Sequence, residues 1–297
     1  MRLGEKADPR YTSHYFQTDS YWAQITQTAR GAAQPGVNST ILKTLTIPLP
    51  PLPEQRRIAD VLDRAEALRA KRLAALALLD TLTQSIFLNM FGDPVSNPKG
   101  WPTSMIGNVA EVQGGLQVNA TRNVHARKVP YLRVANVYRS HLDLREIKQL
   151  PVTDSEAARL ALRKNDLFLV EGHGNPSEIG RCALWDGSIQ GCIHQNHIIR
   201  ARLNFEVANP VYVAEYVNSP GGRRHLLSSG KTTSGLNTIN VTDVRKTPLA
   251  LPPLPIQQDF ARRIAAVEQL RSAQRASLAK LDELFASLQH RAFRGEL

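Results

Sequence analysis

Residues 192–197, with the sequence CIHQNH, bring together side chains that can read nucleic acid bases. Asn and Gln can each form two hydrogen bonds with adenine in the major groove of DNA, and Arg can do the same with guanine. Arg181, Arg200 and Arg202 lie nearby in the sequence. The run predicts base contacts by His194, Gln195 and Asn196. The alternative is that these side chains serve the hydrogen bonding of their own strand.

A second polar segment, EGHGNPS at residues 171–177, directly follows the apolar run LFLV at 167–170. Glycines allow a ligand to approach the backbone closely, and loops on a rigid sheet often carry binding residues. The segment predicts a DNA-facing loop, with a tight turn that binds nothing as the alternative. The candidate contacts here and just beyond are Gly172, His173, Gly174, Asn175, Ser177 and Arg181.

The segment GKTTSGLN at residues 230–237 offers backbone N–H groups, a lysine and hydroxyls to a phosphate. Such contacts position a protein on DNA without reading its sequence. Lys231 and Thr232 are the candidate residues. A related segment, GAAQPGVN at 31–38, lies 199 positions earlier, which favours the alternative of a turn that closes a domain.

A rival chemistry for the same region is a zinc-dependent hydrolase that uses Cys182, Cys192, His194 and His197. Zinc ligands usually come in closely spaced pairs, whereas these cysteines are ten positions apart. In a strand the two histidines would face opposite sides of the sheet. No Walker motif or S-adenosylmethionine loop is found either, so we expect no catalysis, no metal and no cofactor.

The elements that carry these segments are short strands and one short helix. Apolar runs predict strands at residues 109–112 and 131–134, and a buried strand at 167–170. Residues 154–162 predict a short helix with Thr153 as its N-cap.

The flanking regions contain a repeat. LPPLPEQRRIADVLDRAEAL at 49–68 matches LPPLPIQQDFARRIAAVEQL at 251–270, at a constant offset of 202. Proline disfavours helix at the preceding residue, so we expect the helices to begin near Glu54 and Ile256. The first should end near Phe91, at the stop signal Gly92-Asp93-Pro94, after about 55 Å.

Apolar residues recur in these helices with heptad spacing, which predicts two arms packed as an antiparallel coiled coil. Arg72 interrupts the stripe in the first arm, and Gln274 interrupts it at the matching position in the second. The remaining stripe positions of the first arm are Ile58, Val61, Ala65, Leu68, Ala75, Leu79, Leu82 and Ile86.

Charge is concentrated between the two arms. The chain has a net charge of +11, and residues 97–250 carry 19 Lys and Arg against 12 Asp and Glu. A basic domain suggests a polyanionic partner such as nucleic acid. Two cysteines, an N-terminus without a signal sequence and no uninterrupted apolar run of about 18 residues predict a cytoplasmic protein without a membrane segment.

With these motifs in place, the chain resembles the specificity subunit of type I restriction–modification systems. The segments at 49–76 and 83–101 resemble the central conserved region of that family, and residues 251–297 resemble its distal one. The features of a target-recognition domain are Trp101, PYLR at 130–133, KNDL at 164–167 and IGR at 179–181.

The resemblance implies an α+β fold in four parts. These are the end of a first target-recognition domain at 1–48, a helical arm at 49–96, a complete target-recognition domain at 97–250 and a second arm at 251–297. A full family member would have a longer first domain, so the chain is expected to be a shortened form.

The implied function is recognition of double-stranded DNA, with methyltransferase subunits docked on the polar outer faces of the arms and a restriction subunit joining them. A second copy of the chain is a further expected partner, since it would supply a second reader. The rival hypotheses are the hydrolase described above and a coiled-coil scaffold that reads no sequence.

Overall fold

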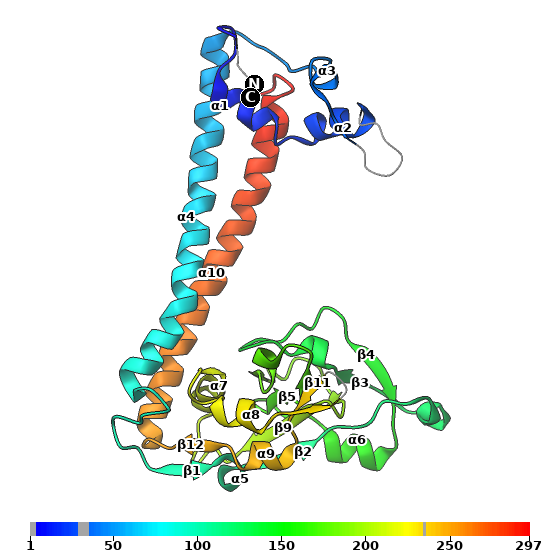
Figure 1. Ribbon diagram of the computed structural model, residues 1–297, viewed down its shortest axis with the longest axis vertical. Coiled ribbons are helices and arrows are strands. Elements are labelled where there is room, and N and C mark those ends of the chain that lie inside the picture. Colours follow the sequence, from blue (N-terminus) through cyan, green and yellow to red (C-terminus); the bar gives the residue numbers. More distant parts are fainter. Residues whose placement is uncertain (1–3, 29–35, 234–235) are drawn as a thin grey trace. The chain divides into compact units, whose positions relative to one another are not determined.

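The computed structural model describes residues 4–28, 36–233 and 236–297 (Figure 1). The chain divides into two compact units. We call Met1–Asp80 with Glu268–Leu297 the helical unit, and Thr81–Val267 the mixed unit. The boundary between these units falls inside both long helices. The four-part division expected from the sequence instead places its boundaries at the ends of the arms, and it stays a prediction.

The two arms form helices α4 (Leu52–Phe91) and α10 (Leu254–Ala292), each beginning two residues before the expected position. Pro53 and Pro255 lie in the first turn, where a backbone N–H has no partner within the helix, so proline is accepted there. The predicted end of α4 is confirmed, because Gly92 follows it with a φ of 81°.

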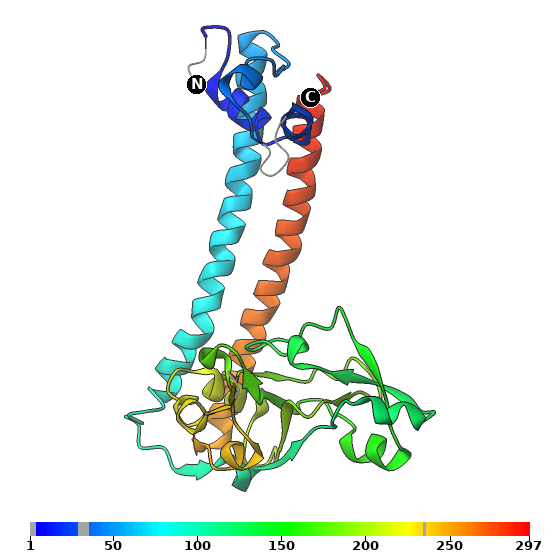
Figure 2. The same ribbon diagram turned by 45° about the vertical axis from the view of Figure 1, so that its right-hand side comes forward.

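Within the helical unit α4 and α10 run antiparallel, side by side in both views (Figures 1 and 2). Arg69 Nε donates to Asp282 Oδ1 over 2.6 Å, and Arg271 Nε lies 3.3 Å from Asp80 Oδ1. Residue numbers rise along one helix as they fall along its partner. The predicted antiparallel coiled coil is confirmed.

Part of the predicted stripe is wrong, since Leu68 and Leu82 of the first arm are both exposed. Leu68 is 49% exposed, and its counterpart Leu270 is 54% exposed. The next residue, Arg69, turns inward instead, and its guanidinium lies 4.8 Å from the centre of the Phe285 ring. An α-helix has 3.6 residues per turn and drifts away from a strict heptad, so the contact stripe moves by one position.

Three short helices complete the helical unit: α1 (Pro9–Tyr15), α2 (Asp19–Thr28) and α3 (Ser39–Leu42). Helix α1 contributes Tyr11 to a core that includes Ile58, Leu62 and Phe285. Because α4 and α10 both supply side chains to this core, it ties the N-terminal segment to the arms.

Buried Gln55 links α1 to the beginning of the first arm. Its Oε1 accepts a hydrogen bond from the N–H of Asp8, the N-cap of α1, over 2.8 Å. Its Nε2 donates to the carbonyl oxygens of Lys6 and Pro50 over 2.9 and 2.7 Å. One amide side chain therefore satisfies three backbone groups.

The mixed unit repeats this arrangement at Gln257, 202 positions after Gln55. Its Oε1 accepts from the N–H of Asn209, the N-cap of α7 (Pro210–Asn218), over 2.8 Å. Its Nε2 donates to the carbonyl oxygens of Val207 and Pro252 over 3.3 and 2.7 Å. The sequence repeat thus extends to the short helix before each arm.

Aromatic packing follows the same duplication. Tyr11 of α1 contacts Phe293 with ring centres 5.1 Å apart, and Tyr212 of α7 contacts Phe91 at 4.6 Å. Phe91 and Phe293 are also related by the offset of 202. In each copy, therefore, the short helix that is bonded to the glutamine at the start of one arm packs against the phenylalanine at the end of the other arm.

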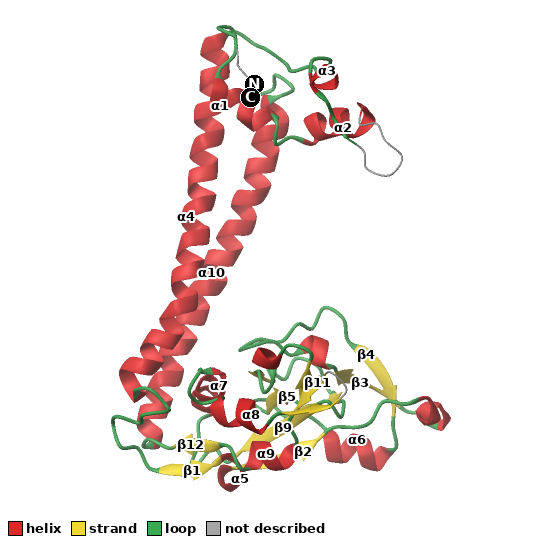
Figure 3. Cartoon of the chain, viewed as in Figure 1, coloured by secondary structure: helices red, strands yellow, loops and turns green. Residues whose placement is uncertain are grey.

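The mixed unit holds every strand of the described chain (Figure 3). The strands are β1 (Thr103–Met105), β2 (Ala110–Gly114), β3 (Lys128–Leu132), β4 (Lys148–Pro151), β5 (Leu167–Val170), β6 (Gly172–His173), β7 (Cys182–Leu184), β8 (Ile193–His194), β9 (Ile198–Leu203), β10 (Lys231–Thr233), β11 (Leu236–Thr238) and β12 (Pro248–Ala250). The remaining helices are α5 (Ile106–Val109), α6 (Asp154–Leu160), α8 (Arg224–Ser229) and α9 (Val241–Arg245), with 3₁₀ turns η1 (Ala120–Val124), η2 (Val134–Asn136) and η3 (Pro176–Glu178).

The largest sheet has the order β2-β9-β5-β7 and is antiparallel throughout. Every residue of β5 is buried, as its apolar sequence predicts. Leu167 and Leu169 enter one core with Tyr212, while Phe168 enters another with Trp185. The sheet is therefore covered on both faces, which gives the loops at its ends a rigid base.

The smaller sheets have the orders β10-β11-β6, β4-β3-β8 and β1-β12. The predicted short helix is confirmed as α6, with Thr153 forming a capping box with Glu156. The predicted strands at 109–112 and 131–134 are found as β2 and β3, displaced by one to three residues.

Helix α4 also contains an 18-residue stretch with a mean hydropathy of 1.4, enough by length and composition to cross a membrane. The prediction of no membrane segment was based on uninterrupted apolar runs, and this stretch is interrupted by polar residues. One such helix is weak support for a span, and the stretch contains Asp80, whose Oδ1 lies 3.3 Å from Arg271 Nε of α10. A charged side chain of this kind is costly in a bilayer.

Candidate nucleic-acid interface

The three polar segments singled out in the sequence meet in the mixed unit. Strand β6 pairs with β11, placing His173 opposite Asn237 and Gly172 opposite Thr238. The Glu171 N–H donates to the carbonyl oxygen of His197 over 3.0 Å. Segments 171–177, 195–197, 231–233 and 236–238 therefore share one edge of the fold.

Glu171 also joins these segments through its side chain. His197 Nδ1 lies 3.1 Å from Glu171 Oε2, and His197 Nε2 lies 3.3 Å from Asn196 Nδ2. The His197 side chain is 59% exposed. These three side chains form a hydrogen-bonded row at the surface, able to offer both donors and acceptors.

A fourth segment, which the sequence did not single out, completes the edge. The Leu116 N–H donates to the His194 carbonyl over 2.9 Å, and the Asn196 N–H donates back to the Leu116 carbonyl over 2.9 Å. A Cβ on Gly115 would lie 2.2 Å from the Gln195 carbonyl oxygen, so only glycine fits there. The Gly114-Gly115 pair was the available signal, since paired glycines mark a close backbone approach.

The predicted contacts of the 171–177 loop lie at or near the surface. Gly174, Asn175 and Ser177 are exposed, and His173 is half-buried. Asn175 Oδ1 accepts hydrogen bonds from the N–H and the hydroxyl of Ser177, so this oxygen stabilises the turn η3. His173 Nδ1 accepts a hydrogen bond from the Asn175 N–H over 3.0 Å. Its Nε2 is therefore the ring nitrogen to consider for a contact with DNA.

Burial removes two predicted residues from the interface. His194 is 0% exposed, with its ring 5.8 Å from Phe168, and burial together with the nearby charge of Arg200 lowers its pKa to about 4. Arg181 is 7% exposed and contacts Glu178 and the ring of Tyr138. Both side chains belong to the interior, so the structure corrects their assignment, while Gln195 and Asn196 remain partly exposed.

The neighbouring arginines are also engaged. Arg202 donates twice to buried Asp166, through Nε and Nη2, each over 2.7 Å. Arg200 is 1% exposed and donates to Glu111 over 2.8 Å. These bonds hold β9 against β2 and β5, so neither arginine is available to a base.

Lys231 and Thr232 begin β10, opposite Thr238 and Asn237 of β11. Their backbone therefore lies in the same small sheet as His173. Their side chains, together with Ser234 and Gly235, lie outside what the structure describes, as do residues 31–35 of the related segment. The N-caps of α3 and α9, Asn38 and Asn240, correspond at an offset of 202, so the structure does not support the offset of 199.

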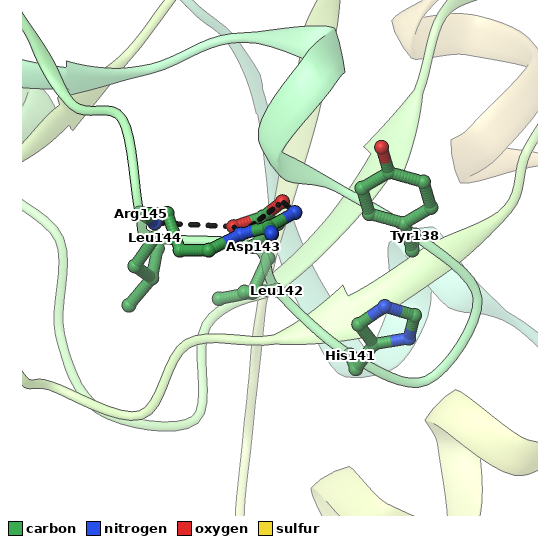
Figure 4. A pocket seen from close by; sticks show the side chains of 6 residues that line it. All are labelled: Tyr138, His141, Leu142, Asp143, Leu144 and Arg145. Atoms are coloured by element: carbon green, nitrogen blue, oxygen red, sulfur yellow. Dashed lines mark hydrogen bonds and ion pairs between the residues drawn. The ribbon is translucent and has the colours of Figure 1, made fainter. Parts of the chain in front are cut away.

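An open hollow of about 750 Å³ lies on a different part of the mixed unit, lined by Tyr138, His141, Leu142, Asp143, Leu144 and Arg145 (Figure 4). The Tyr138 and His141 rings stack with centres 5.0 Å apart. Opposite them, the Arg145 guanidinium holds the pKa of the Asp143 carboxyl down at about 2. None of the predicted contacts lines this hollow.

The geometry does not favour a zinc hydrolase. Within the described ranges, no group of three or more His, Cys, Asp or Glu side chains is placed to hold a metal ion. Cys182 and Cys192 are buried in separate apolar clusters, and burial raises the pKa of both thiols. Thiolates are the form that binds zinc, so both cysteines are poor ligands here.

Comparison with known proteins gives a consistent result. A family model described as the type I restriction modification DNA specificity domain matches residues 3–78. The specificity subunit of the type I restriction enzyme EcoKI from Escherichia coli is 26% identical over 97% of this chain and 65% of its own length. That of StySPI from Salmonella potsdam is 24% identical over 100% and 67%. The chain thus spans about two-thirds of the length of these relatives.

Two solved structures share the fold. A chain from a study of complex assembly and conformational transition in the type I restriction–modification system aligns with a TM-score of 0.65 and 21% identity, over 100% of this chain and 74% of that one. The HsdS subunit from Thermoanaerobacter tengcongensis aligns with a TM-score of 0.52 and 22% identity, over 99% and 72%. In sequence and in fold, the chain is thus similar to the specificity subunits of type I restriction–modification systems.

Proposed function

We propose that the chain reads double-stranded DNA for a type I restriction–modification complex, with the mixed unit as the reader. The observation that carries the proposal is the convergence of segments 115–117, 171–177, 195–197, 231–233 and 236–238 on one edge. Loops gathered on a rigid sheet, with several amide and imidazole side chains, suit hydrogen bonding to base edges.

The side chains at this edge can distinguish bases. Asn196 and Gln195 can each pair with adenine through its N6 and N7 atoms, and Glu171 can accept from the amino group of cytosine. The excess of 19 basic over 12 acidic residues in 97–250 provides attraction to phosphates. Lys231 and Thr232 remain proposed phosphate contacts.

The helices α4 and α10 are proposed to dock methyltransferase subunits, to which a restriction subunit then binds. The sequence expectation was a polar outer face, but in the helical unit that face includes exposed leucines. These are Leu68, Leu73, Leu78, Leu270 and Leu284, each at least 49% exposed. Exposed apolar side chains on paired helices support a protein partner. We propose that the chain is not itself an enzyme and acts in the cytoplasm.

The test is selection of bound sites from a pool of random duplexes by the full chain, followed by affinity measurements on the selected and scrambled sequences. We expect the selected duplex to bind at least 10³-fold more tightly. Asn196→Ala should reduce that ratio by about tenfold or more, since each bidentate base contact is worth about 1–3 kcal/mol. Equal affinity for both duplexes would instead favour a scaffold that reads no sequence.

Partner docking needs its own measurement. The solution mass of the purified chain, alone and with the methyltransferase subunit, distinguishes a single chain, a pair of chains and a mixed assembly. A stable assembly with methyltransferase supports the docking proposal, and no association under any condition contradicts it. Two chains per assembly would support a second copy as the source of a second reader.

A further inference from the structure

Two arginines outside the predicted segments converge on one backbone carbonyl at the border of the interface. Arg139 Nη2 donates to the Ser177 oxygen over 3.2 Å, and Arg223 Nη1 donates to the same oxygen over 2.9 Å. Arg139 follows Tyr138 in its turn, and Arg223 immediately precedes α8. Because Ser177 ends the 171–177 loop, the two arginines lie at the margin of the proposed interface.

The positive charge at this place exceeds what nearby carboxylates neutralise. Glu178 lies between Arg181 and Arg139, at 3.2 and 3.6 Å. Arg223 makes no ion pair with any carboxylate of the described residues, and its Nε is buried without a hydrogen-bond partner. Arg224, next to it, is exposed and adds a further charge.

A partly buried guanidinium is unfavourable unless enough negative charge lies close to it. Burial and the charge of Arg139 lower the pKa of Arg223, and the Glu178 carboxylate offsets this lowering only in part. Glu215 is the other acidic neighbour, and it accepts a hydrogen bond from the Ser140 hydroxyl over 3.0 Å. An anion placed beside Arg139 and Arg223 would relieve their mutual repulsion.

We propose that Arg139 and Arg223 together hold one backbone phosphate of the bound DNA, at the margin of the base-reading edge. This inference rests on the proposed function and adds the contact that sets the register of the duplex. Guanidinium groups match phosphate oxygens in a forked geometry, and phosphate contacts position a protein beside its base contacts. Two arginines from different elements that share one acceptor are fixed in place before DNA arrives.

The experiment compares the full chain with the double variant Arg139→Gln/Arg223→Gln on selected and scrambled duplexes over a series of salt concentrations. We expect the variant to lose affinity for both duplexes by a similar factor of about tenfold. The slope of log affinity against log salt should become shallower by about one, the value for one lost phosphate contact. The matched control is Arg262→Gln/Arg263→Gln, which removes two exposed arginines paired with Asp259 and should leave the slope unchanged.

A purely structural role gives a different result. If the arginines only support the 171–177 loop, the variant will lose affinity for the selected duplex alone, with an unchanged slope, and the proposal is overturned. Arg139→Lys/Arg223→Lys keeps the charge and guards against a folding defect. It should retain the slope of the unchanged chain while binding both duplexes somewhat less tightly.

A measurement without DNA separates this proposal from the proposed function. Inorganic phosphate is titrated into the full chain while the Nε–Hε resonances of the arginines are followed by NMR. A shift that Arg223→Gln abolishes supports an anion site even if no duplex binds, in which case only the proposed function fails. The absence of any shift from inorganic phosphate, together with an unchanged salt slope, removes the anion site.

Discussion

Arg72 Nη1 donates a hydrogen bond to Gln274 Oε1 over 3.0 Å, and the two residues occupy the same position in the two copies of the repeat. The ion pairs on either side are related by the same offset of 202. Arg69 contacts Asp282 in one pair, and the equivalent residues Arg271 and Asp80 form the other. The helical unit thus has an internal two-fold relationship centred on a single polar layer. A self-complementary contact of this kind is usual between identical subunits and here occurs within one chain.

Replacing the polar layer should strengthen the helix pair. In Arg72→Leu/Gln274→Leu, two half-buried polar groups give way to apolar packing, and we expect the free energy of unfolding to rise by about 1–2 kcal/mol. Denaturant titration followed by circular dichroism measures the change. Arg64→Leu, at an exposed position of α4, should leave stability nearly unchanged. A less stable double variant would show that the hydrogen bond contributes more than the packing that replaces it.

The glutamine at the start of the second arm should be essential for stability. Gln257→Ala leaves the Asn209 N–H and the Val207 and Pro252 carbonyls without their partner. Unsatisfied buried groups cost about 1–3 kcal/mol each, partly relieved by water, so we expect a loss of about 3 kcal/mol. Thermal unfolding provides the measurement. The exposed neighbour variant Gln258→Ala should change stability by less than about 0.5 kcal/mol.

Buried His194 predicts that stability falls in mildly acidic solution. Its pKa is about 4 in the folded chain against an ordinary value of 6.5, so its contribution is complete above pH 6.5 and is lost as pH falls toward 4. Only the unfolded chain takes up the proton in that window, which lowers stability by at most about 1.4 kcal/mol per pH unit. His194→Gln should flatten the dependence of unfolding free energy on pH between 6.5 and 4. The exposed-site variant His290→Gln should keep the dependence, and an equal effect of both would contradict this origin.

Two glycine variants test the close approach at the interface. Gly115→Ala places a methyl group against the Gln195 carbonyl, whereas Gly174→Ala meets no atom within 4 Å. We expect the first to cost about 1–3 kcal/mol of stability by overpacking and to weaken binding of the selected duplex at least tenfold. The second should change both quantities little. Fluorescence anisotropy and thermal unfolding are sufficient, and equal behaviour of the two variants would argue against Gly115 positioning the 195–197 segment.

Much of the fold could be predicted from the sequence because its signals are local and repeated. The offset of 202 predicted both arms, and Thr153 as an N-cap predicted α6. Leu68 was misplaced because heptad spacing assumes 3.5 residues per turn, and the long side chain of Arg69 can fill the inward position with its apolar stem. The matching error at Leu270 has the same cause.

The candidate site was predictable in composition but not in assembly. Glycine and amide residues marked the loops at 171–177 and 195–197, yet the pairing of β6 with β11 joins two very short strands that carry no periodic signal. His194 was assigned to the surface because Gln195 and Asn196 follow it. Its burial depends on Leu132 and Phe168, which come from distant strands, and the convergence of Arg139 with Arg223 is equally non-local.

The discontinuous make-up of the helical unit also sets an order of events during synthesis. Tyr11 packs on Phe293, so the core of this unit needs side chains from both ends of the chain. The mixed unit, by contrast, is one continuous segment, Thr81–Val267, and has all its residues once that segment has left the ribosome. The mixed unit can therefore fold during translation, whereas the core that holds Tyr11 is complete only once α10 has been synthesised.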